Sequence, residues 1–264
     1  MISRKSQRMP AVFFGHGSPM NTLERNPYTE AWRRIGDCVP RPQAILAISA
    51  HWYIRGTAVT AMATPRTIHD FGGFPRALFE FQYPAPGSPA LAQRVRNLLA
   101  PLAVRLDDNW GLDHGTWSVL AHAFPQADIP VVQLSIDATQ PAAFHYELGK
   151  RLAPLRDEGV LIVGSGNVVH NLGVIKRDSA APAYDWAVRF NERVRDCLQR
   201  RDHQPLVAYE SMGDDARHAI PTPEHYLPLL YVIGLQDESE PITLAVDGIQ
   251  NASIGMLTVV VGRT

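Results

Sequence analysis

Short, continuous apolar runs that end in polar loops are the feature that most constrains the fold of this chain. Three such runs occupy residues 11–14, 44–49 and 160–163. Runs of this length, bounded by turn signals, are typical of buried strands and are too short for ordinary helices. A histidine follows each run closely. Because ligands gather outside the carboxyl ends of the strands in an α/β sheet, these histidines are predicted to meet in one crevice.

Further segments complete the prediction of an α/β fold, a single-domain three-layer αβα architecture with a mostly parallel (mixed) central sheet. The β-branched run 129–136 is predicted to be a buried strand. Residues 242–246 and 255–261 are predicted to be strands paired antiparallel at one edge, with a turn signal at Asp247–Gly248. No repeat or linker divides the sequence, so residues 1–264 are expected to form one catalytic domain.

Two helices and one long loop are also predicted. Residues 89–99 and 183–198 have helical patterns, and in the second the core face is marked by residues that recur every four positions: Trp186, Phe190, Val194 and Leu198. The run 65–89 carries five prolines and a Gly-Gly pair. It is interpreted as a long surface loop that crosses the active face.

The charge of the chain excludes several classes of partner. Its 25 Lys and Arg balance 26 Asp and Glu, which leaves a net charge of −1. The chain therefore has no basic footprint for nucleic acid and no polybasic signal for a membrane. No stretch approaches the ~20 apolar residues of a membrane span, and the apolar run near the N-terminus is too short for a signal-peptide core. We expect a soluble protein whose partner is a small molecule.

The two cysteines, Cys38 and Cys197, lie far apart in the sequence and form no CxxC motif. They provide no disulfide framework, which favours a reduced, cytoplasmic setting. Both are expected to be buried packing residues.

Four histidines share the local context expected of metal ligands. His16, His51 and His170 stand at or shortly beyond the ends of predicted strands, and His16 is flanked by two glycines that permit close approach. His225 follows Thr222–Pro223, a helix-start signature that places it in the first turn of a helix. The helix dipole there would keep the ring neutral, and neutral imidazoles bind metals. Glu224 is a competing carboxylate ligand or part of the cap.

The remaining histidines carry weaker signals. His114 lies in a turn that leads into a helix, where Asp113 or Thr116 could orient its ring and where it could face a substrate or be structural. The other five histidines are His69, His122, His145, His203 and His218. Surface or core packing roles are expected for most of them, although His69 in the proline-rich loop could face a substrate.

Five motifs occur in order along the chain: GHGSP, SAHW, LDHGTW, GSGNVVHN and PTPEHYLPLL. Together they resemble the type-B catalytic chains of the class III extradiol ring-cleavage dioxygenases, and most closely their 4,5-DOPA dioxygenase branch. The resemblance extends from about residue 12 to residue 260. It implies an Fe(II) enzyme that opens a catechol ring, L-DOPA or a related compound, with O2.

The resemblance also implies residue roles. His16, His51 and His225 would be the metal ligands, His170 the acid/base residue or a fourth ligand, and His114 a substrate-contacting histidine. Relatives often carry another histidine just before the PTPEH motif, whereas this chain has Ile220 at that position. A carboxylate-bearing substrate would need a cationic partner, for which arginine is the natural choice, and the sequence singles out none.

Other functions remain open at this level. Three histidines and a water also form a catalytic zinc set, and Zn(II) may occupy an Fe(II) site, so a zinc hydrolase that uses a metal-bound hydroxide is the main alternative. A non-enzymatic binding module on the same fold is disfavoured by the retention of all four histidines. A serine hydrolase is disfavoured because Ser165 lacks the Gly-x-Ser-x-Gly elbow.

Overall fold

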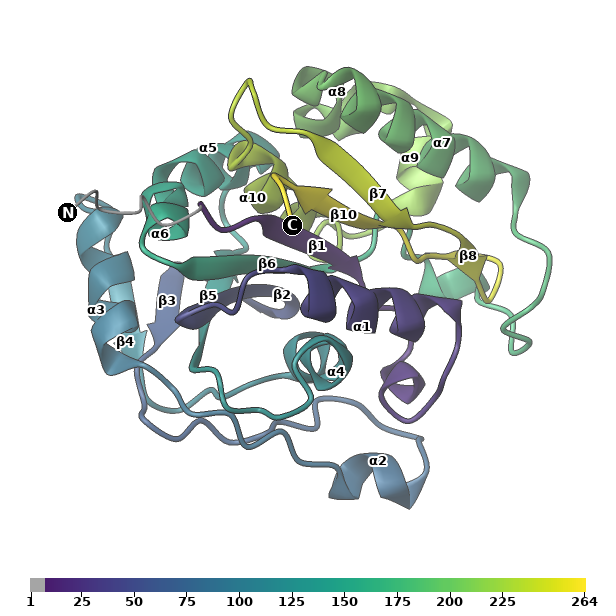
Figure 1. Ribbon diagram of the computed structural model, residues 1–264. Coiled ribbons are helices and arrows are strands. Elements are labelled where there is room, and N and C mark those ends of the chain that lie inside the picture. Colours follow the sequence, from purple (N-terminus) through teal and green to yellow (C-terminus); the bar gives the residue numbers. More distant parts are fainter. Residues whose placement is uncertain (1–7) are drawn as a thin grey trace.

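The apolar runs of the sequence form the centre of a large sheet in the computed structural model, which describes residues 8–264 (Figure 1). The strands of this sheet are β1 (Ala11–Gly15), β2 (Ala44–Ile54), β3 (Thr57–Thr60), β4 (Val104–Asp107), β5 (Val131–Asp137), β6 (Val160–Gly166), β7 (Ile242–Val246) and β10 (Thr258–Val261). Two shorter strands, β8 (Ile249–Gln250) and β9 (Ile254–Gly255), form a separate hairpin.

Helices connect the strands. The α-helices are α1 (Pro27–Cys38), α2 (Arg76–Glu80), α3 (Pro89–Leu98), α4 (His114–Ala123), α5 (Ala142–Leu152), α6 (Pro154–Asp157), α7 (Asp185–Arg200), α8 (His203–Val207), α9 (Asp214–Ala219) and α10 (Leu227–Gly234). Short 3-10 turns occur at η1 (Pro19–Thr22), η2 (Leu172–Val174) and η3 (Tyr209–Met212).

The sheet is mixed, with a parallel centre. Its strand order is β4-β3-β5-β2-β6-β1-β10-β7, and the four central strands β5, β2, β6 and β1 run parallel. At one edge β10 pairs antiparallel with both β1 and β7, which confirms the predicted antiparallel edge. Toward the other edge, which is formed by β4, β3 pairs antiparallel with β5, an arrangement that the sequence did not predict.

Helices cover both faces of the sheet, which confirms the predicted α/β class (Figure 1). Neighbouring residues of β1 pack on opposite faces of the sheet. Phe13 belongs to one buried cluster with residues of α5, α7 and α10, whereas Val12 belongs to another with residues of α1 and α4. Because both faces of the central strands are covered, their sequences are apolar throughout rather than alternating.

Several local predictions are corrected by the structure. The expected strand 255–261 is split into β9 and β10, and Asp247–Gly248 leads from β7 into β8 rather than closing a hairpin onto the terminal strand. The tight turn of the β8–β9 hairpin is at Asn251 and Ala252, which both have positive φ. Neither cysteine is buried: Cys38 is exposed and Cys197 is half-buried.

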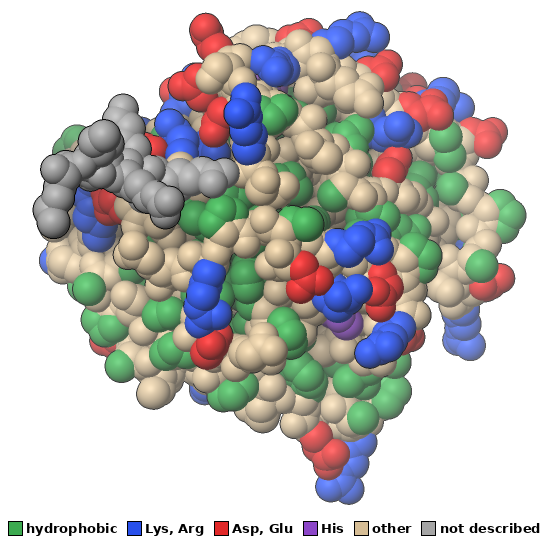
Figure 2. Space-filling model, in the orientation of Figure 1, with side chains coloured by type: hydrophobic (Ala, Val, Ile, Leu, Met, Phe, Trp, Pro, Cys, Tyr) green, Lys and Arg blue, Asp and Glu red, His purple; other side chains and the backbone are tan. Residues whose placement is uncertain are grey.

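The two helices predicted from the sequence agree with the structure, since α3 and α7 lie within two residues of the expected bounds. Within α7, Phe190, Val194 and Leu198 are buried as predicted, while Trp186 is half-buried against the same core. The face of the molecule drawn in Figure 2 mixes basic and acidic side chains. Among residues 8–264, no helix is both long enough and apolar enough to cross a bilayer.

Candidate metal centre

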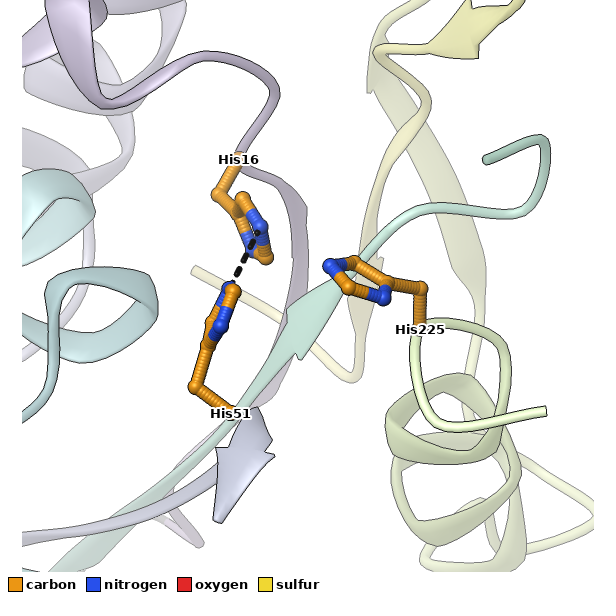
Figure 3. A group of neighbouring side chains, drawn as sticks. All are labelled: His16, His51 and His225. Atoms are coloured by element: carbon orange, nitrogen blue, oxygen red, sulfur yellow. Dashed lines mark hydrogen bonds between the residues drawn. The ribbon is translucent and has the colours of Figure 1, made fainter. Parts of the chain in front are cut away.

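His16, His51 and His225 converge at the carboxyl end of the central strands. One ring nitrogen from each lies within 4.8 Å of the corresponding atoms of the other two. The Nε2 atoms of His16 and His51 are 3.3 Å apart, and the ring of His225 points toward this pair (Figure 3). The sequence places these residues far apart, so the sheet brings together the trio that the motifs singled out.

The outer nitrogen of each ring contacts an oxygen. His16 Nδ1 lies 2.9 Å from Ser165 Oγ, and this hydroxyl donates its own proton to the Gly115 carbonyl at 2.5 Å. Ser165 therefore accepts from His16 Nδ1. Carboxylate oxygens lie 3.3 Å from Nδ1 in the other two rings, Asp70 beside His51 and Glu224 beside His225.

This pattern fits a metal site. With Nδ1 protonated and held by an oxygen, the lone pair of each histidine is on Nε2, the atom that faces the other rings. Three neutral imidazoles arranged in this way suit Fe(II) or Zn(II) and leave further coordination positions for other ligands. The trio His16, His51 and His225 could therefore hold a metal ion.

Glycines allow the chain to pack tightly around His16. The main chain of Met256 lies so close to Gly15 that an added Cβ would be 2.6 Å from the Met256 carbonyl carbon. Gly17 has φ +61°, a conformation that favours glycine. The close approach that the sequence predicted at this glycine pair is therefore made by the loop before β10.

The position of His51 differs from the prediction. It lies within β2, not beyond its end, because β2 continues to Ile54. The register of β2 against β5 is irregular between Ile48 and Tyr53, which is the segment that carries His51. Irregularities of this kind re-aim side chains near functional sites.

The position of His225 is also corrected. Helix α10 begins at Leu227, so Thr222 and Pro223 do not start it and His225 lies in the turn that precedes it. Glu224 does not cap the helix: it accepts a hydrogen bond from Thr222 Oγ1 at 2.8 Å and lies beside the His225 ring. With His170 and His225 it also forms a second group of side chains that could hold a metal ion. The turn is fixed to β6 by the bond from Asn167 N to the His225 carbonyl at 2.8 Å.

His170 stands beside the trio rather than within it. Its ring stacks on that of His225 with centroids 3.4 Å apart and planes inclined by 6°. One of its ring nitrogens lies within 4.8 Å of the possible ligand atoms of Glu224 and His225. It does not belong to the group formed by His16, His51 and His225. The main chain of His170 is held by a bond to the Ala219 carbonyl and by a bridge to Ile254.

His114 lies at the start of α4, on the other side of His51. The two ring centroids are 3.8 Å apart. Asp70 contacts both histidines: Oδ1 lies 3.0 Å from His114 Nδ1 and accepts the His114 backbone N–H at 2.9 Å, while Oδ2 faces His51. Asp70, which the sequence did not single out, therefore orients His114 in place of the expected Asp113 or Thr116.

Burial keeps the clustered histidines neutral. It lowers the pKa of His16 and His225 well below the ordinary value, and neighbouring histidines add to the effect. Burial also lowers the pKa of His51 to about 3 and that of His170 to about 4. Burial alone would raise the pKa of Asp70, but His114 and His51 hold it below its usual value. The structure thus supplies neutral histidines beside two carboxylates, Asp70 and Glu224.

The other five histidines lie outside this cluster. His145 is buried and bonded to Tyr231 Oη, and His203 contacts Tyr146 Oη, in agreement with their expected packing roles. His218 is exposed, as expected. His122 bonds to the Asn21 carbonyl at the end of α4, and His69 bonds to the Phe81 carbonyl, so it does not line the site.

A cavity of about 280 Å³ opens onto the histidines. The loop 65–89, which also contains α2, contributes Asp70, Phe71 and Phe74 to its wall, which confirms that this loop crosses the site. Further lining residues come from two segments that the sequence did not associate with the site, the η2 turn with Ile175 after it and the β8–β9 hairpin. Only the nearness of these two segments to the histidines in the folded protein identifies them, and a single sequence does not contain that information.

Comparisons with known proteins agree with this geometry. The family described as the catalytic LigB subunit of aromatic ring-opening dioxygenase matches residues 11–262. The chain is 57% identical over 265 residues to the 4,5-DOPA dioxygenase extradiol of Escherichia coli K12, covering 99% of this chain and 97% of that protein. It is 40% identical over 242 residues to the protein of the same name from Beta vulgaris, covering 88% of each.

A solved structure has the same fold. The crystal structure of an uncharacterized protein from Escherichia coli K12 superposes with a TM-score of 0.85 at 53% identity, covering 97% of this chain and 100% of that one. The family match extends over nearly the whole chain and includes all the clustered histidines. The chain therefore belongs to the family of the catalytic LigB subunit of aromatic ring-opening dioxygenases.

Proposed function

We propose that this chain, as a single catalytic domain, is an extradiol dioxygenase that opens a catechol ring with O2. The observation that carries the proposal is the convergence of three neutral histidines, each with Nδ1 beside an oxygen, at the base of a cavity in a chain of this family. The names of the relatives support L-DOPA or a related catechol as the substrate.

His16, His51 and His225 would hold the metal. When bound there, Fe(II) supplies the redox-active centre that triplet O2 needs in order to react with a singlet catechol, whereas Zn(II) fits the same nitrogens but has no redox chemistry. The reaction requires no other co-reactant, because both oxygen atoms enter the ring-opened semialdehyde and no electrons are left over. The three-histidine set leaves room for both substrates.

His170 is the proposed acid/base residue. Its ring lines the cavity and is neutral at pH 7, because burial lowers its pKa to about 4, so it can accept a proton from a catechol hydroxyl at Nε2 or Nδ1 and return it later. His114 also lines the cavity and is held by Asp70, which suits it to contact the substrate.

Oxygen uptake tests the proposal. Protein loaded anaerobically with Fe(II) and then given O2 should consume it with catechol or L-DOPA and form a yellow ring-opened product. The Zn(II)-loaded protein should bind the same compounds without consuming O2. Uptake that is equal for the two forms, or absent with every catechol, would reject the dioxygenase and favour the zinc hydrolase, for which a three-histidine set is also suited.

A further inference from the structure

We infer that Arg177, at the mouth of the cavity, binds the carboxylate of a catechol that carries an acidic side chain, as L-DOPA does. This inference rests on the proposed function and assigns a residue to one part of its substrate. The sequence alone does not single out an arginine for a substrate carboxylate. The structure does so through the position of one segment, residues 175–179.

The cavity directs the side chain of a catechol toward its mouth. His16 and His225 are only 2% and 7% exposed, so the nitrogens that would hold the metal lie at the deep end. The walls are lined by five apolar side chains: Phe71, Phe74, Leu172, Ile175 and Ile254. Leu172 is 58% exposed and Ile175 is 44% exposed, which places these two at the mouth. A ring with its two oxygens at the histidines therefore lies between apolar walls, and its side chain extends toward Ile175.

Arg177 is held at this mouth by the β8–β9 hairpin, beside which its segment passes (Figure 1). Residues on both sides of Arg177 are bonded to Asn251, which itself lines the cavity. Lys176 N donates to the Asn251 carbonyl at 3.0 Å, and Asn251 N donates to the Ser179 carbonyl at 3.2 Å. Asn251 Nδ2 adds a bond to the Lys176 carbonyl at 2.8 Å.

The chain length between Ile175 and Arg177 keeps the guanidinium within reach of the cavity. Arg177 follows the lining residue Ile175 by two positions. Their Cα atoms therefore lie within about 7 Å of each other. An arginine side chain can cover that distance.

Arg177 has a free guanidinium, whereas neighbouring cations are engaged. It is exposed, and within residues 8–264 it forms no ion pair and donates no hydrogen bond. Lys176 Nζ lies 4.8 Å from the centroid of the Tyr184 ring, and Arg217 pairs with Asp214. Arg177 is thus the cation of this rim that can receive an anion without breaking an existing contact.

The chemistry of a guanidinium suits a carboxylate. Its planar fork donates two parallel hydrogen bonds to the two carboxylate oxygens, and it stays charged at every physiological pH. Hydrogen bonds between charged partners are stronger than those between neutral ones, so this contact should tighten binding by about tenfold. An amide of the same shape can accept one hydrogen bond but cannot form the ion pair.

Binding of matched compounds to the Zn(II)-loaded protein tests the inference without turnover. The two compounds 3-(3,4-dihydroxyphenyl)propanoate and 3-(3,4-dihydroxyphenyl)propanamide have the same ring and length, and differ only in the terminal group. Calorimetry should show that the propanoate binds about tenfold more tightly than the propanamide. L-DOPA should likewise bind more tightly than its amide. Equal affinities, or tighter binding of the amides, would overturn the inference.

Variants of Arg177 supply the second test. Arg177→Ala should weaken the propanoate by about tenfold and leave the propanamide unchanged. Arg177→Lys should keep part of the preference, because an ammonium keeps the charge but loses the fork. A preference for the propanoate that survives Arg177→Ala would contradict the inference.

Arg200→Ala is the matched control. Arg200 is an exposed arginine at the end of α7 and does not line the cavity, so its removal changes the net charge equally at a different place. This variant should leave both affinities unchanged. Loss of the preference in Arg200→Ala to the same extent as in Arg177→Ala would reduce the effect to net charge. Loss in Lys176→Ala but not in Arg177→Ala would make Lys176 the partner. Either result would reject Arg177.

The outcomes separate this inference from the proposed function. If the Fe(II) protein consumes O2 with catechols but Arg177→Ala binds the propanoate as the wild type does, only the role of Arg177 is wrong. If Arg177→Ala removes the preference but no catechol supports O2 uptake, the carboxylate subsite exists and the dioxygenase proposal fails.

Discussion

At the scale of single residues, Asp70 is a part of the site that the sequence motifs did not anticipate, and it contacts two of the histidines. One carboxylate oxygen faces His51 and the other faces His114, and the side chain is 17% exposed. Carboxylates that hold a ligand histidine fix its tautomer and raise its basicity, and their loss costs about 10- to 100-fold in metal affinity. Asp70→Asn should therefore weaken metal binding by about that factor, measured by competition with a chromophoric chelator.

The control for Asp70 is Asp107→Asn. Asp107 is also a buried carboxylate and accepts the backbone N–H groups of Asn109 and Trp110, but it does not line the cavity. Its variant should keep the wild-type metal affinity even if the protein unfolds more easily. Equal metal affinity for Asp70→Asn and the wild type would show that Asp70 does not support His51.

His170 and His225 are stacked, yet they should respond differently to truncation. His170→Ala should keep one equivalent of metal and lower turnover by ~10²-fold or more, because it removes a proton carrier. His225→Ala should lose the metal as well as the activity. Measuring the metal content of each variant together with its O2 uptake distinguishes the two roles. If His170→Ala lost as much metal as His225→Ala, His170 would be a metal ligand.

The sequence predicted the histidines better than the groups that hold them. His16, His51 and His225 sit in recognisable motifs, and their convergence follows from the parallel strands that carry them. Asp70 lies in an irregular loop, where a lone carboxylate has no distinguishing pattern. Its role depends on how that loop folds over α4, which is a tertiary event that no local rule describes.

At the scale of elements, the contact between β6 and the turn before α10 sets the position of His225. A Cβ added to Gly166 would collide with the His225 carbonyl oxygen. Gly166→Ala should therefore shift this turn, destabilise the protein by about 1–3 kcal/mol and weaken metal binding. Chemical unfolding and chelator competition measure both effects.

Gly72→Ala provides the comparison. An added Cβ there meets no atom within 4 Å, and its φ lies outside the positive range. This variant should change neither the free energy of unfolding nor the metal affinity by a measurable amount. If Gly166→Ala matched it, the close contact would not position His225.

Element types were predictable from sequence, whereas element ends were not. The apolar runs of β1, β5 and β6 were identified because strands buried on both faces must be continuously apolar. β2 extends past His51 through an irregular register, and α10 begins after the Thr-Pro signal, because backbone pairing in the folded site overrides local preference at both positions. The edge strand β4 and its neighbour β3 were not predicted, because each has only four residues and no continuous apolar run.

At the scale of the whole molecule, the fold buries neutral histidines both within the site and away from it. His51 and His170 line the cavity, while His145 of α5 is buried away from it and is bonded to Tyr231 of α10. All three have a lowered pKa because burial disfavours the charged ring. The free energy of unfolding of the metal-free protein should thus depend on pH below neutrality.

The sign follows from proton binding. Burial lowers the pKa of His145 to about 4, whereas an unfolded histidine titrates near 6.5. Between these values the unfolded chain binds more protons than the folded one, so stability rises with pH through this window. The contribution of His145 to the free energy of unfolding is fully present above pH ~6.5. As the pH falls toward ~4, the free energy of unfolding decreases by about 3 kcal/mol because the unfolded chain takes up the proton first.

Denaturant unfolding in a metal chelator, repeated from pH 4 to pH 7.5, measures this dependence. His145→Asn keeps a polar partner for the Tyr231 hydroxyl but cannot be charged, so its stability curve should be flatter than that of the wild type by that amount over the same window. The histidines of the metal site are common to both proteins and cancel in the difference. Parallel curves would mean that His145 titrates in the folded protein as it does in the unfolded chain, and its burial would then carry no pH-dependent stability.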